Sequence, residues 1–529
     1  MFDVQTISII TFVAIFVLLV IGMPLAFSSS ILAVAVLLMK FGPELLFGTF
    51  GQGPLNILAQ RISGMITDYV LISIPLFIFM ANLLERSGIA AEMYDSMNNW
   101  LSRSRGGIAV VTSVMAVLMA AMSGIIGGEV VLLGLIALPQ MLRLGYNQNL
   151  AIGTICASGS LGTMIPPSIV LIMYGMVTET SITALFTASF IPGLMLASLF
   201  IVYIIIRTRL RPDEAPLAAP DPSAPAGRQK AALFLTFLTL LATGVTALLV
   251  LHALWQFAFG VAAVQEGADT KSGLHWLVTL AAVLLVEILL LFGLFGQDRM
   301  RLSWHMGKGL VAPLVVIGVV LGSIYGGVTG ITEAAAMGVM AVMIFTIQRR
   351  EMSFSMLVET LLRSLKATGN IMWVTIGATA LAGAYTIAGG PTYIANAITG
   401  TEISPMVIIL MMMLICLLLG AVMDWVGIVL LIMPVFLPIV NKLPVEDLGI
   451  IGSLNPAHVG IWFGVLFCMN MQVSFLSPPF GPAAFYLKSV APPHISLTDI
   501  FRGFLPFIAL QLIALSVLLV WPPIVSLLL

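Results

Sequence analysis

Two short polar passages interrupt apolar segments of the chain, and each contains a Pro-Pro pair. The first runs from Ser158 to Ser168 (SGSLGTMIPPS), and the second runs from Ser474 to Pro482 (SFLSPPFGP). Within a bilayer, backbone groups released from a helix find partners only in protein, water, ions or a ligand. A matched pair of such breaks predicts the binding site of a secondary transporter built from inverted repeats.

The composition is that of an integral membrane protein. Of the 529 residues, 60% are hydrophobic and only 9% are charged, whereas about a quarter of the residues of a soluble protein are charged. The apolar segments suit helices that cross a hydrocarbon core of about 30 Å, and the strict alternation of a membrane barrel is absent. The net charge of −1, with no basic tract, argues against nucleic acid as a partner.

The order of apolar segments predicts two similar halves, with the domains 1–207, 208–307 and 308–529. The first half has expected spans at 7–22, 25–40, 69–84 and 182–206, a two-armed hairpin at about 108–142 and a broken helix at about 147–176. The second has expected spans at 310–322, 328–347, 371–387 and 504–525, a hairpin at about 406–440 and a broken helix at about 457–488. A proline-rich linker and two inserted spans, at 233–251 and 274–295, lie between them. Pro167 and Pro192 are 25 positions apart and Pro479 and Pro506 are 27 apart, which favours a true repeat over coincidence.

The distribution of charge predicts the orientation of the chain in the membrane. Lysine and arginine cluster at five places, which we assign to the cytoplasm: 103–105, 143, 207–230, 299–308 and 349–366. The loop at 258–273, with Glu266 and Asp269, is then outside. The two halves become inverted copies with both termini on the periplasmic side. Lys40 and Arg61 fall on the outer side, as mild exceptions to the rule.

The first break has the composition of a cation site. Its glycines let the backbone leave helical geometry, and the hydroxyls of Ser158, Ser160 and Thr163 are hard oxygen ligands. Pro166 and Pro167 suit the first turn of a restarting helix, whose positive end favours an anion. The alternative is a simple proline kink, which needs neither the glycines nor the hydroxyls. The second break has fewer hydroxyls, so the kink is a stronger alternative there.

Each two-armed segment is too long for one helix and has small or charged residues at its centre. We interpret both as re-entrant hairpins whose tips, at Ser123-Gly124 and Met423-Asp424, meet the broken helices near mid-membrane. Asp424 lies among apolar residues, and a carboxylate at mid-bilayer usually marks an ion path. The alternative is an Asp in a loop between two full spans. Glu129 is a second, weaker candidate for a carboxylate on an ion path.

Other candidate residues have structural interpretations. Glu333 follows a glycine-rich turn and is expected to cap a helix start. Glu287 is either a contact with a partner helix or a snorkelling end. The three cysteines, Cys156, Cys416 and Cys468, are expected to be small core residues, and the histidines lack metal-ligand spacing. The sequence contains neither a phosphate-binding loop nor the nucleophile or zinc motifs of hydrolases, so we expect neither an enzyme nor a bound cofactor.

These segments together resemble the large membrane subunit (DctM-like) of tripartite ATP-independent periplasmic (TRAP) transporters. The resemblance covers about 1–207 and 308–529. The matching segments are Gly159–Ser168, Ile191–Gly193, Tyr325–Gly327 with Thr332–Ala336, Asp424 in its hairpin, Ser477–Gly481 and Phe504–Pro506.

The resemblance implies an all-α membrane protein of the ion-transporter superfamily, with about 12 spans and two hairpins, that works as an elevator in the inner membrane of a bacterium or archaeon. It implies sodium-coupled uptake of a carboxylate, a small four-span membrane subunit and a periplasmic binding protein as partners. By motif position, one sodium site would use Ser123, Gly124, Ser160, Gly162 and Thr163. The other would use Gly420, Asp424, Ser477 and Pro478. The substrate would lie near Ser168 and Ser474, with Pro166 and Pro167.

The sequence departs from the family pattern at both hairpin tips. Ile125 and Ile126 stand where the family has small polar residues, and Trp425 and Val426 follow Asp424 where the family has Pro-Thr. A stand-alone sodium/dicarboxylate-type carrier, which needs no binding protein, is the alternative function. A channel would require a continuous polar lining, whereas the polar residues here concentrate at two points.

Overall fold

The computed structural model describes residues 2–46, 53–101, 104–217, 225, 227–259, 270–400, 403–421 and 423–529. These residues form helices and turns, without a strand among them. Within them, nine helices are long and apolar enough to cross a membrane. The prediction of an all-helical membrane protein is confirmed, while the exact number of spans stays a prediction. Arg103, Glu266 and Asp269, on which part of the predicted orientation depends, lie outside the described residues.

The helices of the first half follow the apolar segments closely. In order they are α1 (Val4–Val20), α2 (Leu25–Phe41), α3 (Pro54–Ile66), α4 (Ser73–Arg86), α5 (Ile89–Leu101), α6 (Gly107–Ser123), α7 (Ile126–Arg143), α8 (Gln148–Ser160), α9 (Ile169–Thr178) and α10 (Ile182–Leu210). A 3-10 turn, Tyr69–Ile72, leads into α4. The short helices α3 and α5 were not among the expected spans.

The remaining helices include the insertion and the second half. They are α11 (Gly227–Phe259), α12 (Thr270–Leu290), α13 (Gly296–Gly307), α14 (Val311–Tyr325), α15 (Ile331–Gln348), α16 (Phe354–Ile387), α17 (Gly390–Thr399), α18 (Pro405–Gly420), α19 (Trp425–Val440), α20 (Val459–Leu476), α21 (Pro482–Lys488) and α22 (Leu497–Val520). With 34 residues, α16 is twice as long as the expected span at 371–387.

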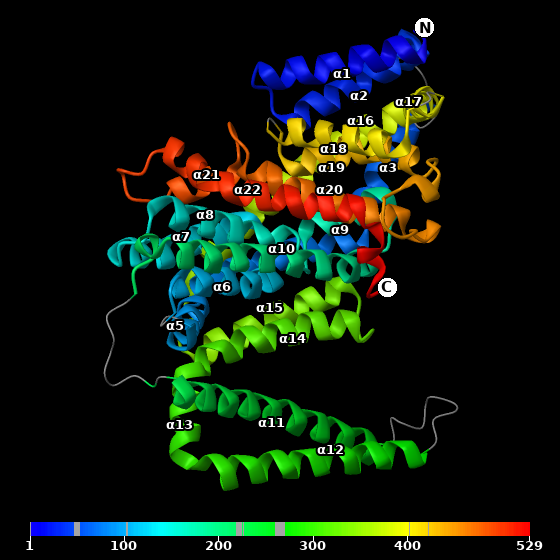
Figure 1. The fold of residues 1–529 in the computed structure, drawn as a ribbon. Helices are drawn as coiled ribbons and strands as arrows, with labels where there is room; N and C mark the ends of the chain where they lie inside the picture. The colour runs from blue at the N-terminus through cyan, green and yellow to red at the C-terminus, as the bar shows by residue number, and fades with distance from the viewer. Residues whose placement is uncertain are drawn as a thin grey trace.

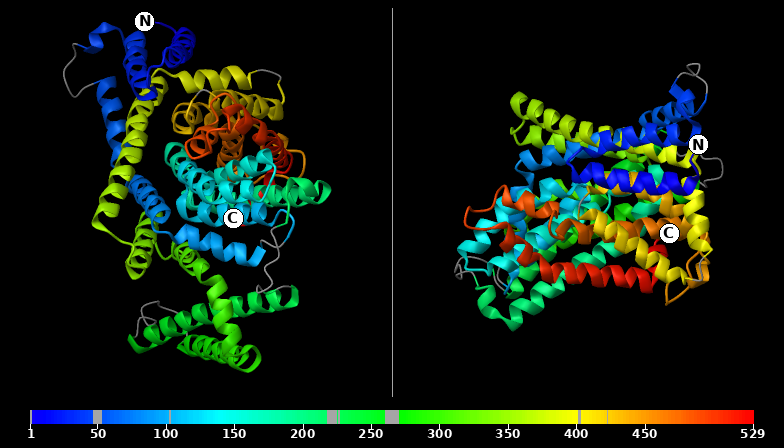
Figure 2. Two further views of the ribbon diagram at one scale, coloured as in Figure 1. Left: turned by 90° about the vertical axis from the view of Figure 1, so that its left-hand side faces the viewer. Right: turned by 90° about the horizontal axis from the view of Figure 1, so that it is seen from above.

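Most helices run side by side in a bundle with an outer wall. Figure 1 shows α1 and α2 at one edge, α11 and α12 at the opposite edge, and the broken helices between them. In the left view of Figure 2, α6–α10 and α18–α22 cluster together while α1–α4 and α14–α16 lie along one side. We call the first group the bundle and the second group the wall. Almost every residue of α20 is buried, so the core of the bundle forms around this helix.

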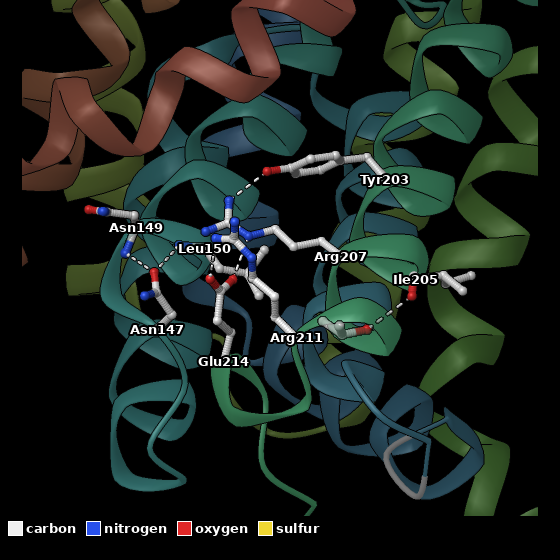
Figure 3. Close-up of polar contacts among 9 residues, drawn as sticks. Asn147, Asn149, Leu150, Tyr203, Ile205, Arg207, Arg211 and Glu214 are labelled. Atoms are coloured by element: carbon white, nitrogen blue, oxygen red, sulfur yellow. Dashed lines mark hydrogen bonds and ion pairs between the residues drawn. The ribbon is translucent and has the colours of Figure 1, made fainter.

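A charged cluster fixes the end of α10 beside the start of α8 (Figure 3). The Arg207 Nε atom donates to Glu214 Oε2 at 2.5 Å, and Arg211 donates to Oε1 of the same carboxylate at 3.2 Å. The Glu214 carbonyl accepts a hydrogen bond from the backbone N–H of Asn147, whose side chain caps α8. The cluster therefore anchors the beginning of the linker to the first broken helix.

The inserted hairpin is attached through the first part of α11. The Trp100 ring of α5 packs edge-on against Phe234 at 5.2 Å between ring centroids. The Ser303 hydroxyl donates to the Leu233 carbonyl at 2.8 Å. Beyond these contacts, α11 and α12 pack mainly on each other and project from the wall (Figure 1). Their exposed leucines and valines suit lipid or another membrane helix.

Candidate functional site

The tip of the first hairpin lies directly on the first broken helix. Between α6 and α7, Gly124 adopts a left-handed conformation with φ of 65°. A Cβ atom at this position would lie 2.4 Å from the Pro167 carbonyl oxygen, so glycine is required by both conformation and space. The Gly124 carbonyl also accepts a hydrogen bond from the Ile169 N–H at 3.4 Å. The structure thus joins Gly124 and Pro167, two of the predicted site residues.

Glu129 fills the space between this tip and the break. Its carboxylate accepts a hydrogen bond from the Ser123 hydroxyl and is 1% exposed. A Cβ atom on Gly162 would come within 2.4 Å of Glu129 Oε1, so the glycine makes room for the carboxylate. Glu129 Oε2 has no hydrogen-bond partner among the described residues. Glu129, which the sequence suggested less strongly than Asp424, therefore lies at the centre of the predicted first sodium site.

The hydroxyl groups of the first break donate to carbonyls that the interrupted helix leaves free. Ser160 donates to the Ala157 carbonyl at 2.8 Å, and Thr163 donates to the Ser160 carbonyl at 3.0 Å. Ser168 donates to the Thr163 carbonyl at 2.5 Å and caps the N-terminus of α9. Each hydroxyl oxygen keeps acceptor capacity after donating its proton. The break thus presents oxygen atoms near the N-terminus of a helix.

The second hairpin meets the second broken helix in a similar way. A Cβ atom on Gly420, at the end of α18, would lie 2.3 Å from the Ser474 hydroxyl oxygen. Asp424 stands directly before α19 and, with Gly420, Met471 and Phe475, lines a cavity of about 190 Å³. Asp424 is exposed towards this space, whereas Glu129 is enclosed. The two hairpins therefore present one open and one closed acidic site.

Ser477 and Pro478 are placed less centrally than the sequence predicts. The Ser477 hydroxyl donates to the Val473 carbonyl at 2.7 Å, and Pro478 is exposed. Neither residue lines the cavity at Asp424. The chain becomes extended at Ser477 after α20 ends, and the later residues Phe480 and Pro482 line the cavity instead. Of the predicted residues in this passage, Ser474 is the one in contact with the second hairpin.

Two buried amides of α20 are functional candidates that the sequence analysis missed. Gln472 donates a hydrogen bond of 2.5 Å to the Thr163 hydroxyl, and Asn470 donates one of 2.7 Å to the Met413 carbonyl of α18. The amide oxygens of both residues are buried without a partner among the described residues. Asn470 and Gln472 could have been recognised from the sequence, because polar side chains within a span are rare and often functional.

The other singled-out residues have local roles. Glu333 accepts a hydrogen bond of 2.9 Å from the Tyr69 hydroxyl, and no side-chain capping bond forms at the start of α15. Glu287 accepts one of 3.3 Å from Thr246, across the inserted hairpin. The three cysteines are buried and unpaired, as expected. Groups of histidine, cysteine and acidic residues that could hold a metal ion are absent from the described part of the chain.

Comparison with solved structures supports the fold. The crystal structure of the YdaH transporter of Alcanivorax borkumensis is similar to this chain, with a TM-score of 0.52 and 14% sequence identity. The match covers 96% of this chain and 97% of the other. At this identity the likeness shows the shared fold and nothing about the substrate.

Curated relatives cover nearly the whole chain. The C4-dicarboxylate TRAP transporter large permease protein DctM of Pseudomonas aeruginosa is 26% identical over 90% of each chain. The sialic acid TRAP transporter large permease protein SiaM of Vibrio cholerae is 24% identical, over 96% of this chain and 94% of its own length. These relatives are permease subunits rather than enzymes, which confirms the expectation that the chain is not an enzyme.

The family described as the DctM component of tripartite ATP-independent periplasmic transporters matches residues 12–524. That match spans both hairpins, both broken helices and the insertion. The chain therefore belongs to the DctM family, the large permease components of TRAP transporters.

Proposed function

We propose that this protein couples the uptake of a small organic acid to sodium, by an elevator movement of the bundle against the wall. In this proposal a periplasmic binding protein delivers the substrate, and the protein lies in the inner membrane with its termini outside. The family assignment supports transport of a small organic acid. Sodium coupling is inferred from the site, and the elevator movement is what the resemblance to TRAP large subunits implies.

The observation that carries the proposal is the contact of each hairpin tip with a broken helix. At the first contact, Glu129 and the hydroxyls of Ser123 and Thr163 lie beside the helix break. At the second, Asp424 faces a cavity next to Gly420 and Ser474. Carboxylate, hydroxyl and carbonyl oxygens are the ligands that hard cations prefer. Both contacts therefore suit sodium.

The buried oxygens without partners support the same conclusion. Glu129 Oε2, Gln472 Oε1 and Asn470 Oδ1 are enclosed without a hydrogen-bond donor among the described residues. Burying a polar atom without a partner costs about 1–3 kcal/mol. A bound cation or substrate donor would remove that cost, so these oxygens favour occupancy of the bundle interior.

The substrate would bind between the two cation sites. The N-terminus of α9, capped by Ser168, carries a partial positive charge that favours an anion. Co-bound sodium would add to this positive charge. Relatives are named for C4-dicarboxylate, sialic acid and 2,3-diketo-L-gulonate, which carry carboxylates, and one is named for isethionate, a sulfonate. We propose a small carboxylate as the substrate, in line with the first three.

The packing of α19 on α16 favours a sliding movement. These helices join the second hairpin to the wall. One cavity between them is lined by small residues of α16, Thr379, Ala382 and Gly383, with Leu430 and Pro434 of α19. A second cavity is lined by the larger Leu381 and Tyr385 of α16. In this proposal α19 moves along the part of α16 that has small side chains.

The partner assignment follows the family, whose TRAP systems are tripartite. We propose that α11 and α12 extend the wall towards the small membrane subunit. They attach at α5 and α13, and α11 borders a cavity with Val114 and Leu118 of α6. The opposite face of the inserted hairpin is left available for that contact.

Uptake into proteoliposomes tests the proposal. The complete three-component system should accumulate the ligand that co-purifies with its binding protein when sodium is supplied outside. Each net positive charge that enters down a potential of 100 mV contributes about 2.3 kcal/mol, so a surplus of sodium makes uptake voltage-dependent. Uptake that is unchanged after sodium is replaced by choline would refute the proposed coupling.

A further inference from the structure

A polar chamber lies between the wall and the bundle, apart from both hairpin tips. It has a volume of about 500 Å³. On the wall it is lined by Arg61 and Asp68, around the end of α3, and by Thr379 and Thr386 of α16. On the bundle it is lined by Glu179, at the end of α9, and by Pro434 of α19. Both moving and fixed parts of the proposed elevator therefore border this space.

Arg61 is the one basic residue in the described lining of the chamber. Its aliphatic part lies against α16, since a Cβ atom on Gly383 would be 3.2 Å from Arg61 Cδ. The guanidinium makes neither a hydrogen bond nor an ion pair with the described residues. In the predicted orientation Arg61 lies on the outer side, where the charge rule disfavours basic residues. An unpaired guanidinium in a polar chamber is available to a carboxylate.

Two helices of the bundle lead from the proposed substrate site to this chamber. Ser168 precedes α9 and Met176, eight residues later, lines the chamber. At a rise of 1.5 Å per residue, the two levels are about 12 Å apart. Asp424 precedes α19, and Leu430 and Pro434 of the same helix line the chamber, which corresponds to about 9–15 Å. The distance from the proposed substrate site to the chamber is therefore similar along α9 and along α19, and in both helices the chamber lies towards the C-terminal end.

We infer that Arg61 contacts the carboxylate of the substrate when the bundle occupies its outer position. This inference rests on the proposed function. A shift of the bundle by about 12 Å along α9 and α19 brings Ser168 to the level of Met176 and Asp424 to a level between Leu430 and Pro434. The substrate site then faces Arg61 across the chamber. The wall thereby contributes one ligand contact in the outer position only.

The acidic residues of the chamber do not replace the substrate as partners of Arg61. Glu179 belongs to the bundle and moves away from Arg61 with it. Asp68 belongs to the wall, but its carboxylate accepts a hydrogen bond of 2.8 Å from the Val70 N–H and caps the turn before α4. In the outer position the guanidinium is therefore left facing the arriving substrate.

The electrostatic part of the inference is tested with charged thiol reagents. Thr386→Cys places a thiol in the chamber, while the three native cysteines are buried. The ratio of modification rates by an anionic and a cationic methanethiosulfonate reports the local potential. We expect Arg61→Gln to lower that ratio at least about threefold, as expected for loss of a steering charge. Lys40→Gln, which removes a cation assigned to the outer side that does not line the chamber, should leave the ratio unchanged. An unchanged ratio in Arg61→Gln would overturn the assignment.

The contact with substrate is tested by uptake in vesicles that contain the complete system. With the ligand obtained from the binding protein, Arg61→Gln should raise KM about tenfold or more and change kcat less. Arg61→Lys should recover part of the loss, because lysine retains charge without the bidentate geometry of arginine. Should Arg61→Gln fail to reach the membrane, Arg61→Lys still carries the test through its raised KM.

Two results would overturn the inference while leaving sodium-coupled transport intact. The first is an unchanged KM in both Arg61 variants. The second is recovery of Arg61→Gln by Glu179→Gln, which would mean that Arg61 only balances the acidic residue. Sodium dependence of the wild type, measured in the same vesicles, reports separately on the proposed function.

Discussion

The side-chain amide of Gln472 donates a hydrogen bond of 2.5 Å to the hydroxyl of Thr163 and so joins the two broken helices. Thr163 in turn donates to Ser160, and its carbonyl accepts from Ser168. The contact crosses 309 residues of sequence. The two breaks are therefore connected through a chain of hydrogen bonds.

Removal of the Thr163 hydroxyl should destabilise the protein. Thr163→Val leaves the buried Gln472 Nε2 without its acceptor, at a cost of about 1–3 kcal/mol. Thr154→Val is the matched control, because Thr154 is equally buried and its hydroxyl has no partner among the described residues. The control should change stability by less than about 0.5 kcal/mol or improve it. Thermal unfolding without sodium measures both, and equal effects would contradict the role of the Gln472–Thr163 bond.

Substitution of Gly162 should displace the tip of the first hairpin. In Gly162→Ala the new methyl group would lie 2.4 Å from Glu129 Oε1, and overpacking of this kind costs about 1–3 kcal/mol. We expect a lower unfolding temperature and a higher sodium concentration for half-maximal uptake. Gly318→Ala, on α14, is the control because nothing lies within 4 Å of its Cβ position. A wild-type sodium response in Gly162→Ala would show that Glu129 is not part of the cation site.

Neutralisation of Asp424 should weaken the response to sodium. Asp424→Asn keeps the shape of the side chain and removes the charge that faces the cavity at the second hairpin. We expect the half-activating sodium concentration to rise about tenfold, which corresponds to 1.4 kcal/mol of lost interaction. Asp447→Asn removes an exposed carboxylate elsewhere and serves as the control. Unaltered sodium activation in Asp424→Asn would remove this residue from the site.

The positions of the helix breaks could be predicted from the sequence because their causes are local. Pro166 and Pro167 interrupt the hydrogen-bond ladder wherever they occur, and Gly124 permits a left-handed turn whatever surrounds it. The structure ends α8 at Ser160, restarts at Ile169 and turns the first hairpin at Gly124. The sequence located these features to within a few residues.

The partners of the site residues could not be predicted in the same way. Gln472 reaches Thr163 and Glu129 reaches Gly162 because separate helices pack against each other, and one sequence does not reveal that pairing. Glu333 illustrates the limit. Its position in the first turn of α15 suggested a cap, yet its carboxylate pairs with Tyr69 from the distant start of α4. The amphipathic helices α3 and α5 were also missed, because their short apolar stripes do not resemble spans.

The cluster at the end of α10 predicts a pH-dependent contribution to stability. Although partial burial opposes its ionisation, hydrogen bonds from Arg207 and Arg211 lower the pKa of Glu214 below its ordinary value. The ionised form is therefore favoured in the folded state, and the stabilisation is complete above the ordinary glutamate pKa of about 4.3. It disappears as pH falls through the lower pKa of the folded protein.

Glu214→Gln should therefore lower the unfolding temperature at pH 7, and its difference from the wild type should shrink below about pH 4. Glu446→Gln is the control, because Glu446 is exposed and forms no ion pair with the described residues. Thermal unfolding across pH 3.5–7 measures the effect. A difference that grows on acidification would contradict the assigned direction.

The inserted hairpin should contact the small membrane subunit. Leu248 of α11 and Leu285 of α12 are 67% and 58% exposed, respectively, and apolar side chains of this kind suit either lipid acyl chains or the helix of a partner. A photo-reactive residue at either position should cross-link to the small subunit in the assembled complex. The matched control is Leu512 of α22, which is 41% exposed on the bundle and should capture only lipid if the bundle slides freely. Capture of the small subunit from position 512 but never from 248 or 285 would reverse the assignment and place that subunit beside the moving part.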